Sequence, residues 1–269
     1  MPVLSMINAC PLCQKTSINL LKVELKKDIV QLWQSRQSIN VEKIILDEEL
    51  PYFSCLHCDY HFYRTNLDKM HLPDLYLRLG KEDWYYCHRI EFDLIPKLIN
   101  LKDVLDFGSG HESFKKTIGD AHYYCFDPYT HDVEIPTRQF ETATALQVLE
   151  HIENPYDIIS QLIQKIVPGG YLVLSVPNRN SFMHKIRKNN PIDLPPHHLS
   201  HWSLKTLKNI PEIFEGLKII KVVACPLEEM HIDLYRNSYG HFLPKKIIKA
   251  ISPLLTGHTI LGIYQKIGC

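Results

Sequence analysis

Residues 104–110 read VLDFGSG, and residues 123–127, one strand length later, read YYCFD. The first stretch predicts an apolar strand and a tight glycine turn that opens a helix, and the second predicts a strand that ends in a carboxylate. Asp127 follows Asp106 at the spacing of about twenty residues with which a carboxylate holds the ribose of a bound nucleotide. A nucleotide-type cofactor is therefore the first hypothesis, although similar glycine turns also occur at purely structural junctions.

The residues of the glycine turn indicate which cofactor suits it. Gly108 and Gly110 have no Cβ, so a ligand can approach the backbone closely, and Asp127 can accept hydrogen bonds from both ribose hydroxyls. The carboxylates of Asp106 and Glu112 flank the turn, and Glu112 stands where a third glycine is usual. A pyrophosphate would meet these negative charges, which disfavours a nicotinamide dinucleotide. The sulfonium and ammonium groups of S-adenosylmethionine suit the turn better, and we expect Asp106 to contact one of them.

Two further segments make the pattern specific. Residues 144–155 read TALQVLEHIENP, a buried strand that runs into a polar turn, and residues 167–178 read VPGGYLVLSVPN, a turn followed by a buried strand. Together with the glycine turn, over roughly residues 84–266, they resemble the small-molecule branch of the class I S-adenosylmethionine-dependent methyltransferases. The resemblance implies an α/β fold with a doubly wound, mostly parallel Rossmann-like sheet. It also implies that the cofactor is bound by Asp106, Gly108, Ser109, Gly110, Asp127, Pro128, Gln147, Val148 and Leu149.

The interval between Asp127 and Phe140 is shorter than this resemblance implies. It cannot hold the helix, strand and loop that normally lie there, so we expect a shortened edge of the sheet. Because the missing region usually contacts adenine, the pocket should be more open and built by Tyr129 and the loop at residues 135–136. An alternative is that Glu112 and the short edge abolish cofactor affinity, which would leave a catalytically inactive binding or assembly protein.

The amino-terminal region carries an independent signal, two CxxC pairs. This spacing lets two thiolates from one turn reach a tetrahedral ion, and four such sulfurs describe a closed, structural zinc site that does not activate water. A redox dithiol and four unrelated buried thiols are the alternatives. The expected zinc ligands are Cys10, Cys13, Cys55 and Cys58.

The surroundings of the cysteine pairs are less regular. Glycine often follows such a pair, but Gln14 and Asp59 stand at these positions, and a helix is predicted between the pairs, over residues 18–35. His57 and His61 are spare ligand candidates, although ordinary surface histidines are the preferred interpretation. Residues 53–60 also resemble the cysteine-rich beginnings of methyltransferases that act on sugars and natural-product intermediates, which implies a sugar or another hydroxylated metabolite as the acceptor.

Composition bounds the class of protein. The chain has 269 residues, 45% of them hydrophobic, and 30 basic residues balance 30 acidic ones. A chain of this length and hydrophobic fraction can form one substantial core and a small module. The balance of charges gives no excess of basic residues that would indicate nucleic-acid binding. The basic run HKIRK at residues 184–188 is interpreted as a solvated loop. No apolar run is long enough to cross a bilayer and the first residues do not resemble a signal peptide, so we expect a cytoplasmic protein with neither membrane nor nucleic acid as partner.

The predicted layout has three parts. A zinc-binding module of the zinc-ribbon kind takes residues 1–65, a polar linker with a covering helix around residues 84–99 takes residues 66–100, and the Rossmann-like methyltransferase domain takes residues 101–269. Within the last part, helices are expected at residues 155–166, 203–214 and 240–251, and late strands at residues 217–224 and 259–266.

Catalytic candidates come from the loop after the VPN segment. Ligands of doubly wound sheets lie beyond the carboxyl ends of the strands, so the loop PPHHLSHW at residues 195–202 should border the acceptor site. Neutral imidazole can remove a hydroxyl proton as a methyl group arrives, which makes His197 and His198 the preferred candidates and His151 a further one. The alternative is that these histidines only anchor the loop. Candidate acceptor contacts are Tyr129, Asp193 and Tyr235.

Overall fold

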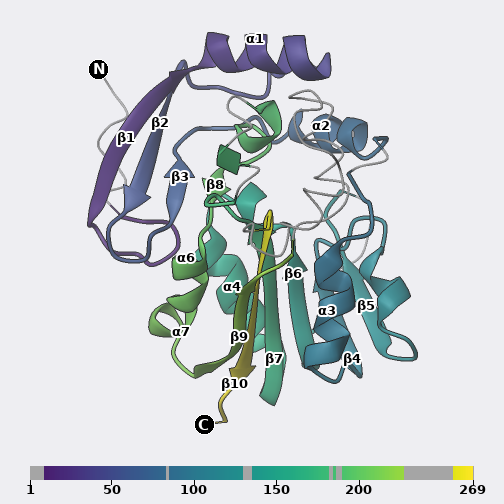
Figure 1. The fold of residues 1–269 in the computed structure, drawn as a ribbon. Coiled ribbons are helices and arrows are strands. Elements are labelled where there is room, and N and C mark those ends of the chain that lie inside the picture. Colours follow the sequence, from purple (N-terminus) through teal and green to yellow (C-terminus); the bar gives the residue numbers. More distant parts are fainter. Residues whose placement is uncertain are drawn as a thin grey trace, which may run out of the picture.

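The computed structural model of the chain describes residues 9–82, 85–129, 135–181, 184–185, 190–226 and 257–268 (Figure 1). The helix predicted at residues 240–251 and the candidate contact Tyr235 lie outside these ranges. None of the helices within them has the length and apolar character that a membrane span requires.

A six-stranded sheet forms the centre of the fold, in the order β5-β4-β6-β7-β10-β9. The first four strands in this order are parallel, and β10 pairs antiparallel with both β7 and β9. This is the doubly wound, mostly parallel sheet that the sequence predicts. The strands are β4 (Asp103–Phe107), β5 (His122–Phe126), β6 (Phe140–Leu146), β7 (Ile166–Pro177), β9 (Leu217–Ala224) and β10 (Thr259–Lys266).

The shortened edge is also present. Among the described strands β5 is the edge of the sheet and pairs with β4 alone, and the chain then passes to β6 on the other side of β4. The glycine turn differs from expectation, because it opens a single 3-10 turn, η1 (Phe114–Thr117), and no α-helix. Few residues separate Gly110 from the start of β5 at His122, and they leave no room for a longer helix.

Apolar side chains alternate between the two faces of the sheet and build two cores. On one face Val104 and Val173 pack with α3 (Ile90–Leu98) and η1, and on the other Leu105 and Leu172 pack with three helices. The alternation follows from the two-residue period of a strand. The helices on the second face are α4 (Pro155–Gln164), α6 (Leu204–Lys208) and α7 (Ile210–Ile213).

Two predicted helices have different bounds. The segment 203–214 is broken at Asn209, since Pro211 has no N–H for a continuous helix and sits in the first turn of α7. The covering helix predicted from residue 84 begins only at Ile90. The segment before it, predicted as a polar linker, contains α2 (Leu72–Leu79), whose Leu75 and Leu79 are buried.

A second, four-stranded sheet has the order β1-β2-β3-β8. The segment 18–25, predicted as the start of a helix, is the strand β1, because its backbone pairs with β2 from Ile18 opposite Cys55 to Leu25 opposite Glu49. The helix α1 (Lys26–Gln37) begins only after it. The fourth strand comes from far along the chain, so the amino-terminal region and the loop after β7 share one sheet. The elements are β1 (Ile18–Leu25), β2 (Glu49–Cys55), β3 (His61–Tyr63) and β8 (Ser200–His201).

The helix α1 closes a third core over the same loop (Figure 1). Trp33 is fully buried in this core, and its Nε1 donates a hydrogen bond to the carbonyl of Pro195 at 3.0 Å. The indole therefore joins the amino-terminal region to the loop that carries the predicted catalytic histidines.

Replacing this indole should destabilise the protein strongly. We expect Trp33→Ala to lower the free energy of unfolding by about 3–5 kcal/mol, since it removes a large buried side chain and leaves a cavity. Gln34→Ala, on the exposed side of the same helix, should change it by less than about 0.5 kcal/mol. Urea unfolding curves measure both changes, and equal effects of the two substitutions would contradict the packing of α1.

Candidate functional site

A pocket of about 460 Å³ lies at the carboxyl ends of β4, β5, β6 and β7. This volume is within the range of about 300–1,000 Å³ that is usual for small-molecule sites. All but one of the predicted cofactor residues line it, namely Asp106, Gly108, Ser109, Gly110, Asp127, Pro128, Gln147 and Val148. Leu149 is the exception. It is the first residue of the turn η2 (Leu149–His151), and its side chain is fully buried in the core.

The two glycines of the turn have the backbone conformation that the sequence predicts. Both have positive φ, +75° at Gly108 and +51° at Gly110. A Cβ on Gly108 would lie 2.3 Å from Cγ2 of Val148, and one on Gly110 would lie 2.3 Å from the ring of Tyr86. Larger residues are therefore excluded at both positions, and the turn can pack closely against its neighbours.

Asp127 lies at the end of β5 and is fixed by the backbone around it. Its Oδ2 accepts a hydrogen bond from the N–H of Gly110 at 3.0 Å, and its Oδ1 accepts one from the N–H of Tyr129 at 2.9 Å. A carboxylate oxygen can accept more than one hydrogen bond, so these two bonds do not by themselves exclude a ribose hydroxyl. The side chain is buried and lines the pocket, which fits the predicted role.

Asp106 and Ser109 complete the turn side of the pocket. The carboxylate of Asp106 accepts hydrogen bonds from the hydroxyls of Tyr123 and Thr144. Burial raises its pKa to about 6. The hydroxyl of Ser109 is buried and has no hydrogen-bond partner among the described residues, so a polar group of a ligand would satisfy it.

Glu112 does not block the pocket. It adopts the left-handed conformation of the glycine that it replaces, with φ of 54°. Its carboxylate accepts hydrogen bonds from Nζ of Lys115 at 2.7 Å and from the thiol of Cys125 at 3.5 Å, and it is not among the residues that line the pocket. The volume beside the glycine turn is therefore open to a ligand.

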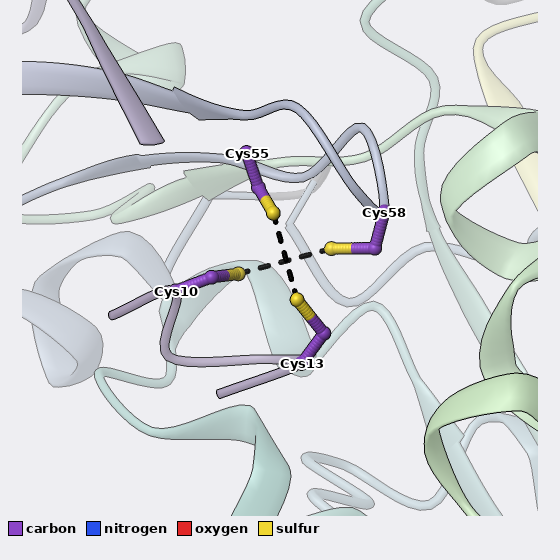
Figure 2. A group of neighbouring side chains, drawn as sticks. All are labelled: Cys10, Cys13, Cys55 and Cys58. Atoms are coloured by element: carbon purple, nitrogen blue, oxygen red, sulfur yellow. Dashed lines mark hydrogen bonds between the residues drawn. The ribbon is translucent and has the colours of Figure 1, made fainter. Parts of the chain in front are cut away.

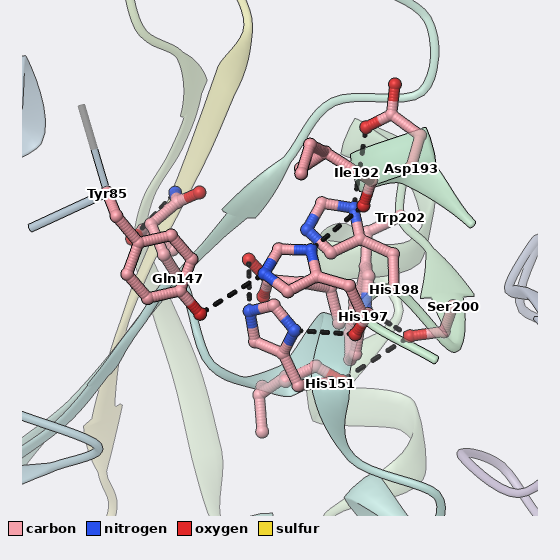
Figure 3. Close-up of polar contacts among 12 residues, drawn as sticks. Tyr85, Gln147, His151, Ile192, Asp193, His197, His198, Ser200 and Trp202 are labelled. Atoms are coloured by element: carbon pink, nitrogen blue, oxygen red, sulfur yellow. Dashed lines mark hydrogen bonds and ion pairs between the residues drawn. The ribbon is translucent and has the colours of Figure 1, made fainter. Parts of the chain in front are cut away.

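The opposite wall holds the three predicted catalytic histidines, which come together although they are distant in sequence (Figure 3). The ring centroids of His151 and His197 are 4.4 Å apart, and those of His197 and His198 are 4.6 Å apart. Burial lowers the pKa of His151 to about 3 and that of His197 well below its usual value, so both are uncharged at neutral pH. All three line the pocket.

Two carboxylates accompany the histidines. Glu150 is buried, with Oε1 3.7 Å from Nε2 of His151, and burial raises its pKa to about 7. Asp193, a predicted acceptor contact, has Oδ1 3.4 Å from Nδ1 of His198. Burial alone would raise the pKa of Asp193, but the interaction with His198 outweighs it and keeps that pKa below its usual range.

The sequence did not indicate two aromatic residues of the pocket, Tyr76 and Tyr85. Tyr85 places its hydroxyl 3.2 Å from Nε2 of His197, and Tyr76 stacks on Tyr129 with the ring centroids 4.6 Å apart. Both tyrosines precede β4, and no local motif marks them as part of a site. Tyr129 lines the pocket as predicted, but the loop at residues 135–136 is not among the lining residues.

The four cysteines form a compact cluster (Figure 2). The sulfur of Cys10 is 3.7 Å from that of Cys58, and the sulfur of Cys13 is 3.5 Å from that of Cys55. These distances are too long for a disulfide bond. They are close to the S···S distance of about 3.8 Å that a tetrahedron with Zn–S bonds of about 2.3 Å requires. The donor set and its size therefore fit a zinc ion.

The backbone of the two cysteine turns is alike. Gln14 and Asp59, which stand where glycine is usual, both take the left-handed conformation, with φ of 60° and 62°. The N–H of Gln14 donates to the carbonyl of Cys10 at 2.9 Å, and the N–H of Asp59 donates to the carbonyl of Cys55 at 3.1 Å. His57 is exposed and does not belong to the cluster, as the preferred interpretation of the sequence had it.

Comparison with curated proteins gives a match over a short segment. The mitochondrial ubiquinone biosynthesis O-methyltransferase of Schizosaccharomyces pombe is 44% identical over 46 residues, which are 17% of this chain and 16% of that protein. The match thus spans about a sixth of the length of this curated relative.

Similar solved structures have low sequence identity. One chain of a complex between the Haloferax volcanii Trm112 methyltransferase activator and a methyltransferase is 12% identical, with a TM-score of 0.49 over 74% of this chain and 98% of that chain. N-methyltransferase NodS from Bradyrhizobium japonicum WM9, in complex with S-adenosyl-L-homocysteine, is 11% identical, with a TM-score of 0.45 over 72% of this chain and 97% of that chain.

A family model described as "Methyltransferase domain" matches residues 80–217, just over half of the chain. The matched segment contains the glycine turn, Asp127 and the three histidines of the pocket. The chain belongs to the methyltransferase domain family.

Proposed function

We propose that the protein transfers the methyl group of S-adenosylmethionine to a small-molecule acceptor, a sugar or another hydroxylated metabolite. The observation that carries this proposal is the shared pocket of about 460 Å³, in which the glycine turn and Asp127 face the buried His197 and His198 and the half-buried His151. One wall suits the cofactor and the other suits the acceptor.

The charges around the pocket suit a cationic cofactor. Carboxylates line it at Asp106, Asp127, Glu150 and Asp193, whereas Arg89 is the one lysine or arginine among the described lining residues. A sulfonium and an ammonium group would be attracted to these carboxylates, and a pyrophosphate would be repelled.

In the proposed reaction, the cofactor supplies a methyl group on a sulfonium, which is already an activated leaving group. The chain contributes alignment, which is worth up to about 7–11 kcal/mol when two reactants are well oriented. Asp127 would hold the ribose, and the glycine turn would admit the cofactor close to the backbone. The histidine wall, with His197 and His198 first and His151 next, would lie beside the acceptor and could take a proton from its hydroxyl.

Cofactor affinity should depend on Asp127. We expect Asp127→Ala to weaken binding of S-adenosylhomocysteine by about tenfold or more, since hydrogen bonds to a charged group are worth about 1.5–3 kcal/mol. Asp120→Ala, which removes an exposed carboxylate, should bind as the unchanged protein does. Isothermal titration calorimetry measures both affinities.

Because Asp127 also accepts hydrogen bonds from two backbone N–H groups, Asp127→Asn serves as a second variant that keeps one acceptor oxygen. Thermal unfolding confirms that each variant is folded. Absence of any binding heat with the unchanged protein would favour the inactive binding protein over the enzyme.

The buried carboxyl of Asp106 should make stability depend on pH. Folding raises its pKa from 3.8 to about 6, so the folded chain holds this proton more tightly than the unfolded chain. The stabilisation is complete below about pH 4 and is lost as the pH rises through 6. Between pH 4 and pH 7 the free energy of unfolding should therefore fall by about 2.4 kcal/mol relative to Asp106→Asn. Urea unfolding at a series of pH values tests this, and parallel profiles of the two proteins would refute it.

We propose further that Cys10, Cys13, Cys55 and Cys58 hold one structural zinc ion. All four are buried, and they belong to the same core as Tyr60 and the sheet residues under α4. With four sulfur ligands the ion would have no open position, so its contribution would be to the fold and not to the reaction.

Loss of one cysteine ligand should remove the metal. We expect Cys58→Ser to reduce the zinc content from one ion per chain to nearly none and to lower the free energy of unfolding by more than about 3 kcal/mol. Cys125→Ser, outside the cluster, should keep the zinc. Inductively coupled plasma mass spectrometry measures the content, and a full complement of zinc in Cys58→Ser would rule out this site.

A further inference from the structure

We propose that His151, His197 and His198 form a second metal site, which binds a divalent transition-metal ion inside the pocket. One ligand nitrogen from each ring lies within 4.8 Å of the other two. A tetrahedral site with metal–nitrogen bonds of about 2.1 Å needs nitrogen separations of about 3.4 Å, so small ring rotations would close the cluster on an ion.

The hydrogen bonds of the three rings select the nitrogen that each would offer. Nδ1 of His151 donates to the carbonyl of His197 at 2.7 Å, and Nδ1 of His197 donates to the carbonyl of Ile192 at 2.9 Å. Nδ1 of His198 faces the carboxylate of Asp193 at 3.4 Å. In a neutral imidazole the proton on Nδ1 leaves a lone pair on Nε2. His151 and His197 thus present Nε2 as a ligand atom, whereas Nδ1 of His198 makes no hydrogen bond among the described residues, so His198 can offer either ring nitrogen.

His151 and His197 have the arrangement that metal-binding histidines use. Such a histidine almost always donates its other ring N–H to a backbone carbonyl or a carboxylate, which fixes the ring and its tautomer. Figure 3 shows the remaining nitrogens of the three rings turned to one side, toward Tyr85. Nε2 of His197 also lies 3.2 Å from the hydroxyl of Tyr85, so an ion bound there would displace this hydroxyl or take it as a further ligand.

Glu150 provides a second, independent observation. Its carboxylate is 2% exposed, and its Oε2 has no hydrogen-bond partner among the described residues. Its Oε1 lies 3.7 Å from Nε2 of His151, on the same side as the nitrogen ligands. A buried carboxylate oxygen without a partner is costly, and a cation beside it would offset that cost.

The donor set narrows the choice of ion. Three imidazoles and one carboxylate favour Zn²⁺, Co²⁺, Ni²⁺ or Fe²⁺ over Mg²⁺ and Ca²⁺, which prefer oxygen ligands. The cluster lines the pocket, so an ion there would face the acceptor. A bound metal lowers the pKa of a coordinated hydroxyl, so with the ion present the metal, and not an imidazole lone pair, would activate the acceptor oxygen, and the hydroxyl proton would leave to water. This last role rests on the proposed function, but metal binding itself does not.

Cobalt titration tests the site in the full protein with zinc already in the cysteine cluster. We expect one Co²⁺ per chain, with visible d–d absorption and without the thiolate-to-metal charge-transfer band that binding to cysteines would give. His151→Ala with His198→Ala should lose this cobalt while keeping one zinc. His88→Ala, which removes an exposed histidine outside the pocket, should keep both metals.

Absence of bound cobalt in the unchanged protein, or cobalt that persists in the double variant, would overturn the site. If the double variant folds poorly, X-ray absorption of the unchanged cobalt protein decides instead, since a nitrogen and oxygen shell supports the proposal and a sulfur shell refutes it. Calorimetry with S-adenosylhomocysteine on the same samples tests the cofactor site separately, so failure of one proposal is distinguishable from failure of the other.

Discussion

The pairing of β3 with β8 is the constraint on which the pocket depends. It places His61 opposite His201 and so fixes the end of the loop that carries His197 and His198 to the amino-terminal sheet. The N–H of Leu199 donates to the carbonyl of Glu150 at 2.8 Å, which fixes the same loop to the central sheet. Because the loop is held from both sides, its imidazoles have defined positions against His151. Without the amino-terminal sheet, one wall of the pocket would have no support.

Local patterns predicted the central sheet well and the amino-terminal sheet poorly. The segments around Val104, Val173 and Ile263 are apolar, bounded by turn residues and buried on both faces. A short apolar run of this kind is itself enough to predict a buried strand. The strand β1 has no such signal. Most of its residues are exposed, and only its backbone pairing with β2 makes it a strand. Pairings of this kind depend on distant segments and are invisible to a local pattern.

The site shows the same division. The glycine turn, Asp127 and the cysteine pairs are short motifs, and the structure brings the first two to the pocket and the cysteines into one cluster, although the turn opens a 3-10 turn and not the expected helix. The histidines were identified one by one, but their association could not be, because 46 residues separate His151 from His197. The orientation of their rings depends on hydrogen bonds to carbonyl groups of the loop backbone. The amino-acid sequence does not show which carbonyl groups lie near each ring, so the orientation could not be predicted from it.

The shortened edge of the sheet explains why the amino-terminal region lies against the pocket. A strand beyond β5 would normally help to enclose the cofactor, but β5 is the edge strand of the described sheet. Tyr76 of α2 stacks on Tyr129, which directly follows the end of β5, and both line the pocket. An aromatic side chain from the amino-terminal region thus covers the side that the sheet leaves open. Trp33 of α1 supports the histidine loop on the other wall, so two segments that precede the central sheet in the chain, α1 and α2, help to build both sides of the pocket.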